Sequence, residues 1–431
     1  MKNDFAFAKT RQFAPLFGTQ FLGAFNDNLF KNSLFALISF YGLGKNDWLP
    51  PEQMLNLGAL LFVLPYFLFS TLAGQLATRF DKARLARAVK VFEMAIMALA
   101  GWGFSASSAP VLLLCLFLMG VHSTIFGPVK YAILPEYLGE KHLLTGNGLI
   151  ESGTFLAILF GQILGAAMAG QGSTVLAVVV FVVAAAGFAS SLFMPSAPPQ
   201  NPQAKIHWNL WRDTKELWRQ IRAQNELRTA ILGISWFWLV GAVYTTQLLT
   251  FTQLHLGGNA NVFNLMLTLF SIGIATGSVL CSKVSKGSLH LIWVLFGGIG
   301  LSIFGGLLVY LTHTLHFAGH PLQGIGQFLQ RGHAYPIMLA MLGIGFFGGF
   351  FSVPLYTWLQ MRSSDEFRAH AIAANNIANA VFMVAAAIAS AVLLKLFDSV
   401  LLLYLLVAVG NLPMLAYLVY RYPAIFRRQA G

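Results

Sequence analysis

Residues 174–194 read TVLAVVVFVVAAAGFASSLFM, and this stretch contains no Asp, Glu, Lys or Arg. A helix needs about 20 mostly apolar residues to cross the hydrocarbon core of a bilayer, so this run is long enough to span a membrane. Further apolar runs of similar length follow one another along the chain, and together they predict an all-α membrane protein with twelve transmembrane helices. We expect these helices near residues 13–41, 54–78, 88–107, 110–131, 145–170, 174–194, 229–254, 261–281, 290–312, 336–360, 369–395 and 398–420.

The composition of the 431-residue chain excludes an ordinary soluble enzyme. Hydrophobic residues make up 57% of it and charged residues only 10%, whereas soluble domains average about 25% charged residues. The apolar runs are continuous, which excludes a membrane β-barrel built from segments of alternating polarity. Cys115 and Cys281 both lie in apolar runs, so a disulfide scaffold and a cysteine-built metal site are also excluded.

The net charge of +12 is explained by orientation in the membrane and does not indicate a nucleic-acid partner. With both termini placed in the cytoplasm, 23 of the 27 Lys and Arg residues fall before, between or after the predicted helices on the cytoplasmic side. Lys45, Arg331 and Lys395 fall on the outer side, and Lys31 lies within a span. Cytoplasmic loops of membrane proteins carry such an excess of basic residues. We therefore predict that both termini are cytoplasmic.

The longest gap between apolar runs divides the chain into three parts. We predict an N-terminal six-helix bundle over 1–194, a cytoplasmic linker over 195–228 and a C-terminal six-helix bundle over 229–431. Within the linker, Trp208, Trp211, Trp218 and Ile221 recur at helical spacing among basic residues. Such an amphipathic helix is expected to lie in the headgroup layer, with its cations near anionic membrane lipids. Its role is either that of a strap joining the bundles or that of a docking site for a soluble enzyme.

An internal repeat indicates that the two bundles are related. Asn147 follows Pro128 by 19 residues, and Asn375 follows Pro354 by 21 residues. Glu151 and Asn379 each come four residues after the first asparagine of their half, so they occupy equivalent helix faces. Weak similarity between six-helix halves is typical of secondary transporters, whose binding sites lie where the repeats meet.

The first predicted helix carries an unusual number of polar side chains for a transmembrane segment. Ionised side chains within a membrane cost about 2.5–3.5 kcal/mol on insertion scales, so they mark functional sites by default. Asp27 and Lys31 lie one turn apart and form either a self-neutralised pair or part of a polar path. The path reading is favoured by the neighbouring amides. The candidate substrate or ion path comprises Gln20, Asn26, Asp27, Asn28, Lys31, Asn147, Glu151 and Asn379. For Glu93, which follows Lys90 closely, we expect an ion pair at the membrane interface.

A second group of charged residues lies at the predicted cytoplasmic mouth. Residues 74–84 read GQLATRFDKAR, which resembles a weakened copy of the Gly-x-Leu-Ala-Asp-Arg-x-Gly-Arg-Arg signature of the major facilitator superfamily, with Thr78 at the acidic position. In that signature the charges hold the inner face closed, and Asp81 is the possible substitute for the missing acid. The candidate gate or headgroup residues are Arg79, Asp81, Arg84, Lys130, Glu136 and Arg362.

Two stretches resemble the bacterial lysophospholipid transporter family more specifically. They are residues 20–28, QFLGAFNDN, and residues 127–136, GPVKYAILPE, which continue to GNGLIES at 146–152. The resemblance implies a flippase that moves lysophospholipids, such as lysophosphatidylethanolamine, from the outer to the inner leaflet of the bacterial inner membrane. It also implies a reacylating acyltransferase/acyl-carrier-protein synthetase. Some relatives carry that enzyme fused to the C-terminus, and because this chain ends at Gly431 we expect a separate protein.

The chemistry of a lysophospholipid fits an uneven distribution of charge. No Asp, Glu, Lys or Arg occurs between Thr229 and Cys281, so we expect headgroup contacts in the first half and a tail-cavity wall that includes Trp236 and Trp238. We expect no cofactor. His313, His316 and His320 lack an accompanying carboxylate or cysteine, so no metal site is expected there. A coupling ion, Na⁺ or H⁺, is possible at the buried carboxylate.

Two other functions remain open on the sequence. One is a cation-coupled transporter of a small polar solute. The other is a non-transporting membrane scaffold that holds a lipid-remodelling enzyme through the linker helix. Enzymatic activity is not expected, since neither a nucleotide-binding Gly-x4-Gly-Lys-[Ser/Thr] motif nor a His-x4-Asp acyltransferase motif occurs.

Overall fold

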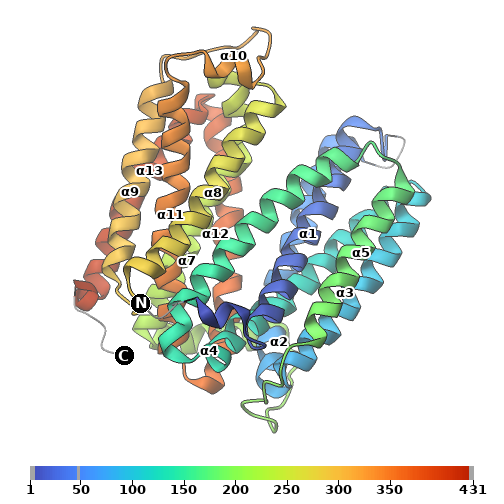
Figure 1. The fold of residues 1–431 in the computed structure, drawn as a ribbon, viewed down its shortest axis with the longest axis vertical. Coiled ribbons are helices and arrows are strands. Elements are labelled where there is room, and N and C mark those ends of the chain that lie inside the picture. Colours follow the sequence, from blue (N-terminus) through green and yellow to red (C-terminus); the bar gives the residue numbers. More distant parts are fainter. Residues whose placement is uncertain (1–4, 46–48, 427–431) are drawn as a thin grey trace. The chain divides into compact units, whose positions relative to one another are not determined.

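The computed structural model describes residues 5–45 and 49–426, and this part of the chain folds into helices joined by turns and loops (Figure 1). Lys2, Arg427 and Arg428, which the orientation argument counts as cytoplasmic, lie outside the described residues. The elements are η1 (Ala6–Lys9), α1 (Ala14–Phe40), α2 (Pro51–Arg79), α3 (Lys82–Ser105), α4 (Ala109–Met168), α5 (Ser173–Leu192), α6 (Leu210–Ala223), α7 (Asn225–Leu256), α8 (Ala260–Val284), α9 (Ile292–Thr312), α10 (Ile325–Leu329), α11 (Ala334–Arg362), α12 (Asp365–Phe397), α13 (Val400–Arg421) and η2 (Pro423–Phe426).

Helix α4 replaces two predicted helices and the loop between them. Its 60 residues are interrupted at Gly139, which has φ 62° and ψ 174°. Only glycine adopts such a positive φ at little cost, so the two limbs of α4 meet at this residue. The predicted loop over 132–144 is therefore wrong, because helical structure continues up to the glycine. Counting the limbs of α4 separately, the described residues contain the twelve long helices expected from the sequence, and the all-α prediction is confirmed.

Ten helices in the described part of the chain are long and apolar enough to cross a membrane, with α4 counted once. Helix α1 does not reach that threshold because its sequence includes Gln20, Asn26, Asp27, Asn28, Lys31 and Asn32. Its polar side chains must therefore find hydrogen-bond or ion-pair partners on neighbouring helices.

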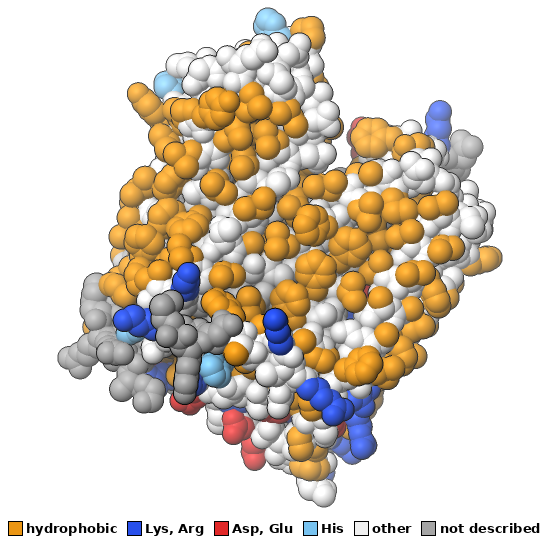
Figure 2. Space-filling model, viewed as in Figure 1, with side chains coloured by type: hydrophobic (Ala, Val, Ile, Leu, Met, Phe, Trp, Pro, Cys, Tyr) orange, Lys and Arg blue, Asp and Glu red, His pale blue; other side chains and the backbone are white. Residues whose placement is uncertain are grey.

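Figure 2 shows hydrophobic side chains over most of the length of the helices, with most of the basic side chains gathered towards the lower edge.

The chain divides into two compact units. Unit 1 comprises Met1–Gly146, Leu156–Gln224 and Gln360–Ile377, and unit 2 comprises Asn147–Phe155, Asn225–Leu359 and Ala378–Gly431. Relative to the predicted six-helix halves, each unit includes one short segment from the other half. The division at 1–194, 195–228 and 229–431 stays a prediction.

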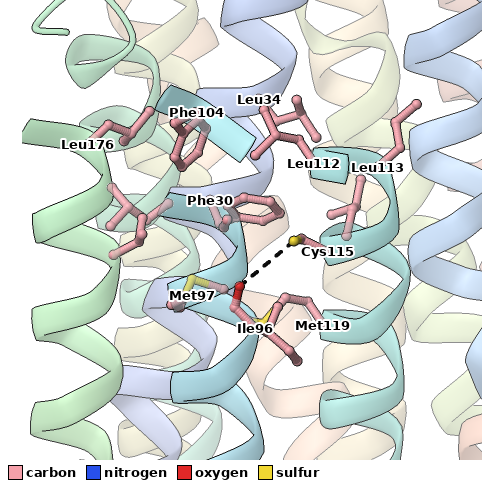
Figure 3. Packing of buried hydrophobic residues seen from close by; sticks show 14 of the residues in the cluster. Phe30, Leu34, Ile96, Met97, Phe104, Leu112, Leu113, Cys115, Met119 and Leu176 are labelled. Carbon is pink, nitrogen blue, oxygen red and sulfur yellow. Dashed lines mark hydrogen bonds between the residues drawn. The ribbon is translucent and has the colours of Figure 1, made fainter. Parts of the chain in front are cut away.

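The core of unit 1 is formed by helices α1 to α5. Phe30 of α1 contacts Phe104 of α3 edge to face, with ring centroids 5.8 Å apart (Figure 3). The thiol of Cys115 on α4 points to the carbonyl of Ile96 on α3 at 3.8 Å, within the same apolar cluster. Cys115 is therefore a packing residue, as its apolar sequence context indicates.

Glycines allow α8 and α11 of unit 2 to approach closely. A Cβ atom at Gly277 would lie 2.0 Å from the carbonyl oxygen of Phe346, and one at Gly345 would lie 2.1 Å from that of Phe270. Gly273 and Gly349 extend the two patterns by one turn, as in the small-xxx-small motifs of membrane helix pairs. The backbones pack where no side chain fits between them.

This packing predicts that Gly277→Ala destabilises the protein. The added methyl group meets backbone rather than a movable side chain, and overpacking of this kind costs about 1–3 kcal/mol. The measurement is thermal unfolding of the purified protein in detergent. Gly306→Ala on α9 is the matched control, since a Cβ atom there meets nothing within 4 Å. Equal unfolding temperatures for the two variants would contradict the assigned packing.

The predicted amphipathic linker helix is present as α6, and it packs against α2 within unit 1. Leu217 and Ile221 are its buried residues. Thr214 shares a hydrogen bond of 2.8 Å with Thr71, and Asp213 accepts one of 3.3 Å from Gln75. Trp208 and Trp211 lie away from this contact and are 76% and 84% exposed. The position of α6 in the headgroup layer stays a prediction.

Candidate functional site

The polar face of α1 is buried in unit 1. Asn26 is fully buried, Asp27 and Asn28 are each 8% exposed, and Gln20 is also buried. The side-chain amide of Asn28 donates a hydrogen bond of 2.9 Å to the carbonyl of Ala24, one turn earlier on the same helix. Asn26 and Asp27 instead contact side chains of α3 and α4.

These contacts form a buried ionic cluster that comprises Asn26 and Asp27 of α1, Lys90 and Glu93 of α3, and His122 and Ser123 of α4. Ser123 donates a hydrogen bond of 2.5 Å to Oδ2 of Asp27. Asn26 donates one of 2.8 Å to Oε1 of Glu93, and the ammonium of Lys90 lies 2.6 Å from Oε2 of the same carboxylate. His122 lies between the two carboxylates, with Nδ1 3.9 Å from Asp27 and Nε2 3.3 Å from Glu93.

Local sequence explains how the cluster is accommodated. Lys90 and Glu93 are three residues apart, which places them on one face of α3. A Cβ atom at Gly23 would lie 2.5 Å from the Lys90 ammonium, so a larger residue at this position of α1 would require the lysine side chain to shift. The Phe126 ring stacks on the imidazole of His122 at 6.3 Å and lies 5.3 Å from Nζ of Lys90. The cation is therefore held by a carboxylate and an aromatic face.

One sequence-based expectation about this region is wrong, and one open alternative is decided. Glu93 and Lys90 do pair, but both side chains are fully buried rather than at an interface. Asp27 and Lys31 do not form an ion pair within 4.0 Å among the described residues, because Lys31 lies over the Phe62 ring at 5.2 Å. Asp27 is thus not neutralised by the cation one turn away.

Sequence reasoning missed His122 and Ser123, and it expected Lys90 and Glu93 only as an ion pair at the interface. A signal was available, since His122 and Ser123 interrupt the apolar run predicted for residues 110–131. What the sequence could not indicate is that these side chains meet α1, because spacing along one helix does not identify its neighbours.

The remaining path candidates lie in unit 2. Asn147 donates a hydrogen bond of 3.0 Å to the hydroxyl of Thr357, and Asn379 accepts one of 2.9 Å from Ser235. Glu151 is buried in the same unit. The structure therefore divides the predicted path residues between the two units.

The two predicted tail-wall tryptophans make different contacts. The indole of Trp236 donates to Asn411 at 2.8 Å, whereas that of Trp238 donates to the hydroxyl of Tyr356 at 2.8 Å. Phe155 stacks on Trp238 with centroids 6.1 Å apart, and Phe237 contacts Phe155 edge to face. Trp238 therefore belongs to an aromatic group in unit 2 with Phe155, Phe237 and Tyr356.

The gate candidates of unit 1 occupy varied environments. Lys82, which is fully buried, forms an ion pair of 2.8 Å with Glu136, and Gln200 donates to the same carboxylate. Lys130 lies over the Tyr131 ring at 4.5 Å. The carbonyl of Tyr131 accepts a hydrogen bond from Gln360 at 2.9 Å, so α4 is tied to the end of α11 within this unit.

The residues of the signature-like loop act mainly on local structure. Asp81 caps α3 by accepting from the backbone N–H of Arg84, and it also accepts from the hydroxyl of Ser196. Arg79 lies over the Phe80 ring at 5.6 Å, and the side chain of Arg84 is exposed. A capping carboxylate accepts a hydrogen bond from a free backbone N–H of the first turn, so Asp81 stabilises the N-terminus of α3.

In the second half, Arg362 is exposed, and the buried arginine at this end of the chain is Arg368. Its guanidinium donates to the carbonyl of Gln360 and forms an ion pair of 2.7 Å with Asp365. The sequence analysis named Arg362 as a gate candidate and did not identify Arg368.

Within residues 5–45 and 49–426, no group of three or more His, Cys, Asp or Glu side chains is placed to hold a metal ion. His316 lies near His255, with ring centroids 6.2 Å apart, and His255 contacts the carbonyl of Leu315.

Comparison with known proteins agrees with the resemblance derived from residues 20–28 and 127–152. The lysophospholipid transporter LplT of Cronobacter sakazakii is 28% identical over 368 residues, which cover 83% of this chain and 82% of that protein. The protein of the same name from Salmonella newport is 29% identical over 371 residues, with the same coverage.

Solved structures with the same fold cover nearly the whole chain. The human organic anion transporter MFSD10 (TETRAN) has a TM-score of 0.72 at 15% identity, covering 94% of this chain and 99% of its own. FucP, a Major Facilitator Superfamily transporter in the outward conformation, has a TM-score of 0.69 at 12% identity, with coverages of 95% and 98%. The pattern of the Major Facilitator Superfamily itself matches residues 16–319. On its helices, its sequence and its structural neighbours, this chain is a multi-pass membrane protein that belongs to the Major Facilitator Superfamily.

Proposed function

We propose that this protein is a transporter that moves lysophospholipids from the outer to the inner leaflet of the bacterial inner membrane, with both termini in the cytoplasm. Similarity to the LplT proteins over more than four fifths of both chains supports the substrate class. The fold supports transport rather than enzymatic catalysis.

The observation that carries the proposal is the state of Asp27. One of its oxygens accepts a hydrogen bond from the neutral hydroxyl of Ser123, and the other oxygen, Oδ1, accepts none among the described residues. A buried carboxylate with an unused acceptor costs free energy unless a ligand, water or a proton meets it. Intramembrane carboxylates of this kind mark substrate or ion paths.

Asp27 and Lys31 together suit a zwitterionic headgroup. They lie one turn apart on α1, which places their Cβ atoms about 5–6 Å from one another. Because they do not pair with each other, the carboxylate is available to an ammonium group and the Lys31 ammonium to a phosphate. Lysophosphatidylethanolamine carries these two charges in adjacent positions.

The acyl chain requires an apolar surface, and we place it on the aromatic group of Phe155, Phe237, Trp238 and Tyr356 in unit 2. We expect Trp238→Ala to weaken transport of a long-chain lysophospholipid by about tenfold, since burying a large apolar side chain contributes about 1.5–3 kcal/mol. A short-chain analogue should be affected less. Trp102→Ala is the control, since Trp102 is 60% exposed at the end of α3. Equal losses for both chain lengths would assign Trp238 to folding alone.

The direct test is a leaflet-specific flipping assay in vesicles containing the purified protein. We expect labelled lysophosphatidylethanolamine to move faster than in protein-free vesicles, without competition from sugars or amino acids. Competition by such solutes, with no lipid movement, would support the alternative of a small-solute transporter. Repeating the assay with and without a sodium or proton gradient tests for a coupling ion, Na⁺ or H⁺.

The scaffold alternative concerns α6 and two exposed tryptophans near its start. We propose that Trp208, which precedes the helix, and Trp211, in its first turn, enter the headgroup layer beside anionic lipid. A separate acyltransferase/acyl-carrier-protein synthetase would then reacylate the product. Under the transporter proposal, a Trp208→Ser/Trp211→Ser variant retains flipping in purified vesicles. Loss of activity through these residues, with none through Asp27, would favour a scaffold.

A further inference from the structure

The segment between α5 and α6, residues 195–209, contains four prolines and no helix or strand. Boundaries between compact units usually fall in exposed, Pro-rich segments of this kind, because few contacts cross them. By that rule, the flexible connection between the two halves of the transporter would lie here. The hydrogen bonds of the segment indicate a different position.

The start of the segment is bonded to α3 and α4 of unit 1. The hydroxyl of Tyr137 donates a hydrogen bond of 2.5 Å to the carbonyl of Pro195. The backbone N–H of Lys82 donates one of 3.0 Å to the carbonyl of Ala197, whose side chain is buried. Lys82 is the first residue of α3, so its N–H has no partner within its own helix. The segment therefore completes the N-terminus of α3.

The rest of the segment is bonded to the end of α2. The backbone N–H of Asn201 donates a hydrogen bond of 3.1 Å to the carbonyl of Thr78, which lies in the last turn of α2 and has no partner within that helix. The backbone N–H of His207 donates one of 2.8 Å to the side chain of Gln75. Helix α6 then continues along α2, to which Thr214 and Asp213 bind it. The whole stretch from α5 to the end of α6 is therefore part of unit 1.

Helix α7, in contrast, is attached to unit 2 from its first residue. The side-chain amide of Asn225 donates a hydrogen bond of 3.0 Å to the carbonyl of Arg421, the last residue of α13. The guanidinium of Arg421 donates one of 2.5 Å back to Asn225. Leu227, two residues further on, is buried.

Gln224 is the one residue between these two attachments. It separates the end of α6 at Ala223 from the start of α7 at Asn225. Its backbone is extended, with φ −105° and ψ 96°, and its side chain is exposed. The boundary between the two compact units also falls directly after Gln224.

We propose that Gln224 is the covalent hinge between the two halves, and that residues 195–223 move as a part of unit 1. The halves of secondary transporters move as nearly rigid bodies during transport. Hinges are a few residues at the ends of elements that absorb the change in backbone angles. Rotation about Gln224 leaves the hydrogen bonds of residues 195–207 and the Asn225–Arg421 pair intact. The inference does not depend on which substrate the protein moves.

The first test is amide hydrogen exchange of the wild-type protein in detergent. We expect the amides of Lys82, Asn201 and His207 to exchange slowly, because each is hydrogen-bonded within unit 1. Exchange of residues 196–207 at the rate of an unstructured peptide would overturn the proposal. This measurement needs no variant, so a misfolded variant would not protect the proposal.

The second test compares two insertions of equal length. A Gly-Gly insertion after Gln224 lengthens the hinge, so we expect it to retain both the unfolding temperature and flipping. A Gly-Gly insertion after Gln200 displaces Asn201 and His207 from their partners. Each hydrogen bond lost is expected to lower the unfolding temperature by about 2–4 °C.

The other outcomes contradict the proposal. A silent insertion after Gln200, with destabilisation by the insertion after Gln224, would place the hinge in the Pro-rich segment. Destabilisation by both insertions would show that α6 and α7 form one rigid element. Equal unfolding temperatures for wild type and both variants would show that the segment is not held by unit 1. Failure of the wild-type protein to flip any lysophospholipid would overturn the proposed function, but it would leave hydrogen exchange and unfolding temperatures as tests of the hinge.

Discussion

Asp27→Asn reduces lysophosphatidylethanolamine flipping by about 10- to 100-fold, because hydrogen bonds to a charged group contribute about 1.5–3 kcal/mol. The substitution retains the shape of the side chain and an acceptor for Ser123, but removes the negative charge that would hold an ammonium group. The measurement is the flipping rate in vesicles, corrected for the amount of folded protein. A smaller effect on lysophosphatidylglycerol is expected, since that lipid presents no cation to Asp27.

The matched control is Asp398→Asn in the turn between α12 and α13. Asp398 is exposed and has a φ of 48°, a conformation that asparagine also adopts readily. Asp398→Asn makes the same chemical change at a position far along the chain from the cluster, so we expect this variant to retain flipping. Full activity in Asp27→Asn would remove the observation on which the headgroup assignment depends.

Lys90→Met destabilises the fold by about 3–5 kcal/mol, the usual cost of removing one partner of a buried ion pair. Both side chains of the pair are fully buried, so the substitution leaves the Glu93 carboxylate without a counter-charge. Asn26 donates only a neutral hydrogen bond to this carboxylate and does not replace the lost charge. Thermal or denaturant unfolding in detergent should show the loss clearly, because it is a large share of the stability of most proteins.

The double variant Lys90→Met/Glu93→Leu tests the reason for that loss. If the cost comes from an unbalanced charge, removing both charges recovers most of the stability. Arg219→Met serves as an exposed control, because the Arg219–Glu216 pair lies largely in solvent, where ion pairs contribute little to stability. Equal stability of Lys90→Met and Arg219→Met would contradict the burial of the cluster.

The sequence by itself determined the helices and their composition. Membrane spans are predictable because the bilayer requires about 20 apolar residues in succession, a property of each segment alone. The same local rule marked α1 as exceptional and identified Asp27, since a carboxylate in a span is conspicuous whatever surrounds it. It failed at residues 132–144, where polar residues were read as a loop although the helix continues to Gly139.

Only the tertiary structure decided which side chains meet. Helical spacing put Asp27 and Lys31 on one face of α1 and left open whether they pair. In the structure Asp27 accepts from Ser123 of α4, and Lys31 lies over the Phe62 ring of α2. Lys90 and Glu93 were expected at the interface, whereas α3 carries them into the core beside His122. The physical reason is that a charge within a membrane takes its partner from whichever helix is packed against it. That neighbour is set by the packing of the whole bundle and not by the spacing of residues along one helix.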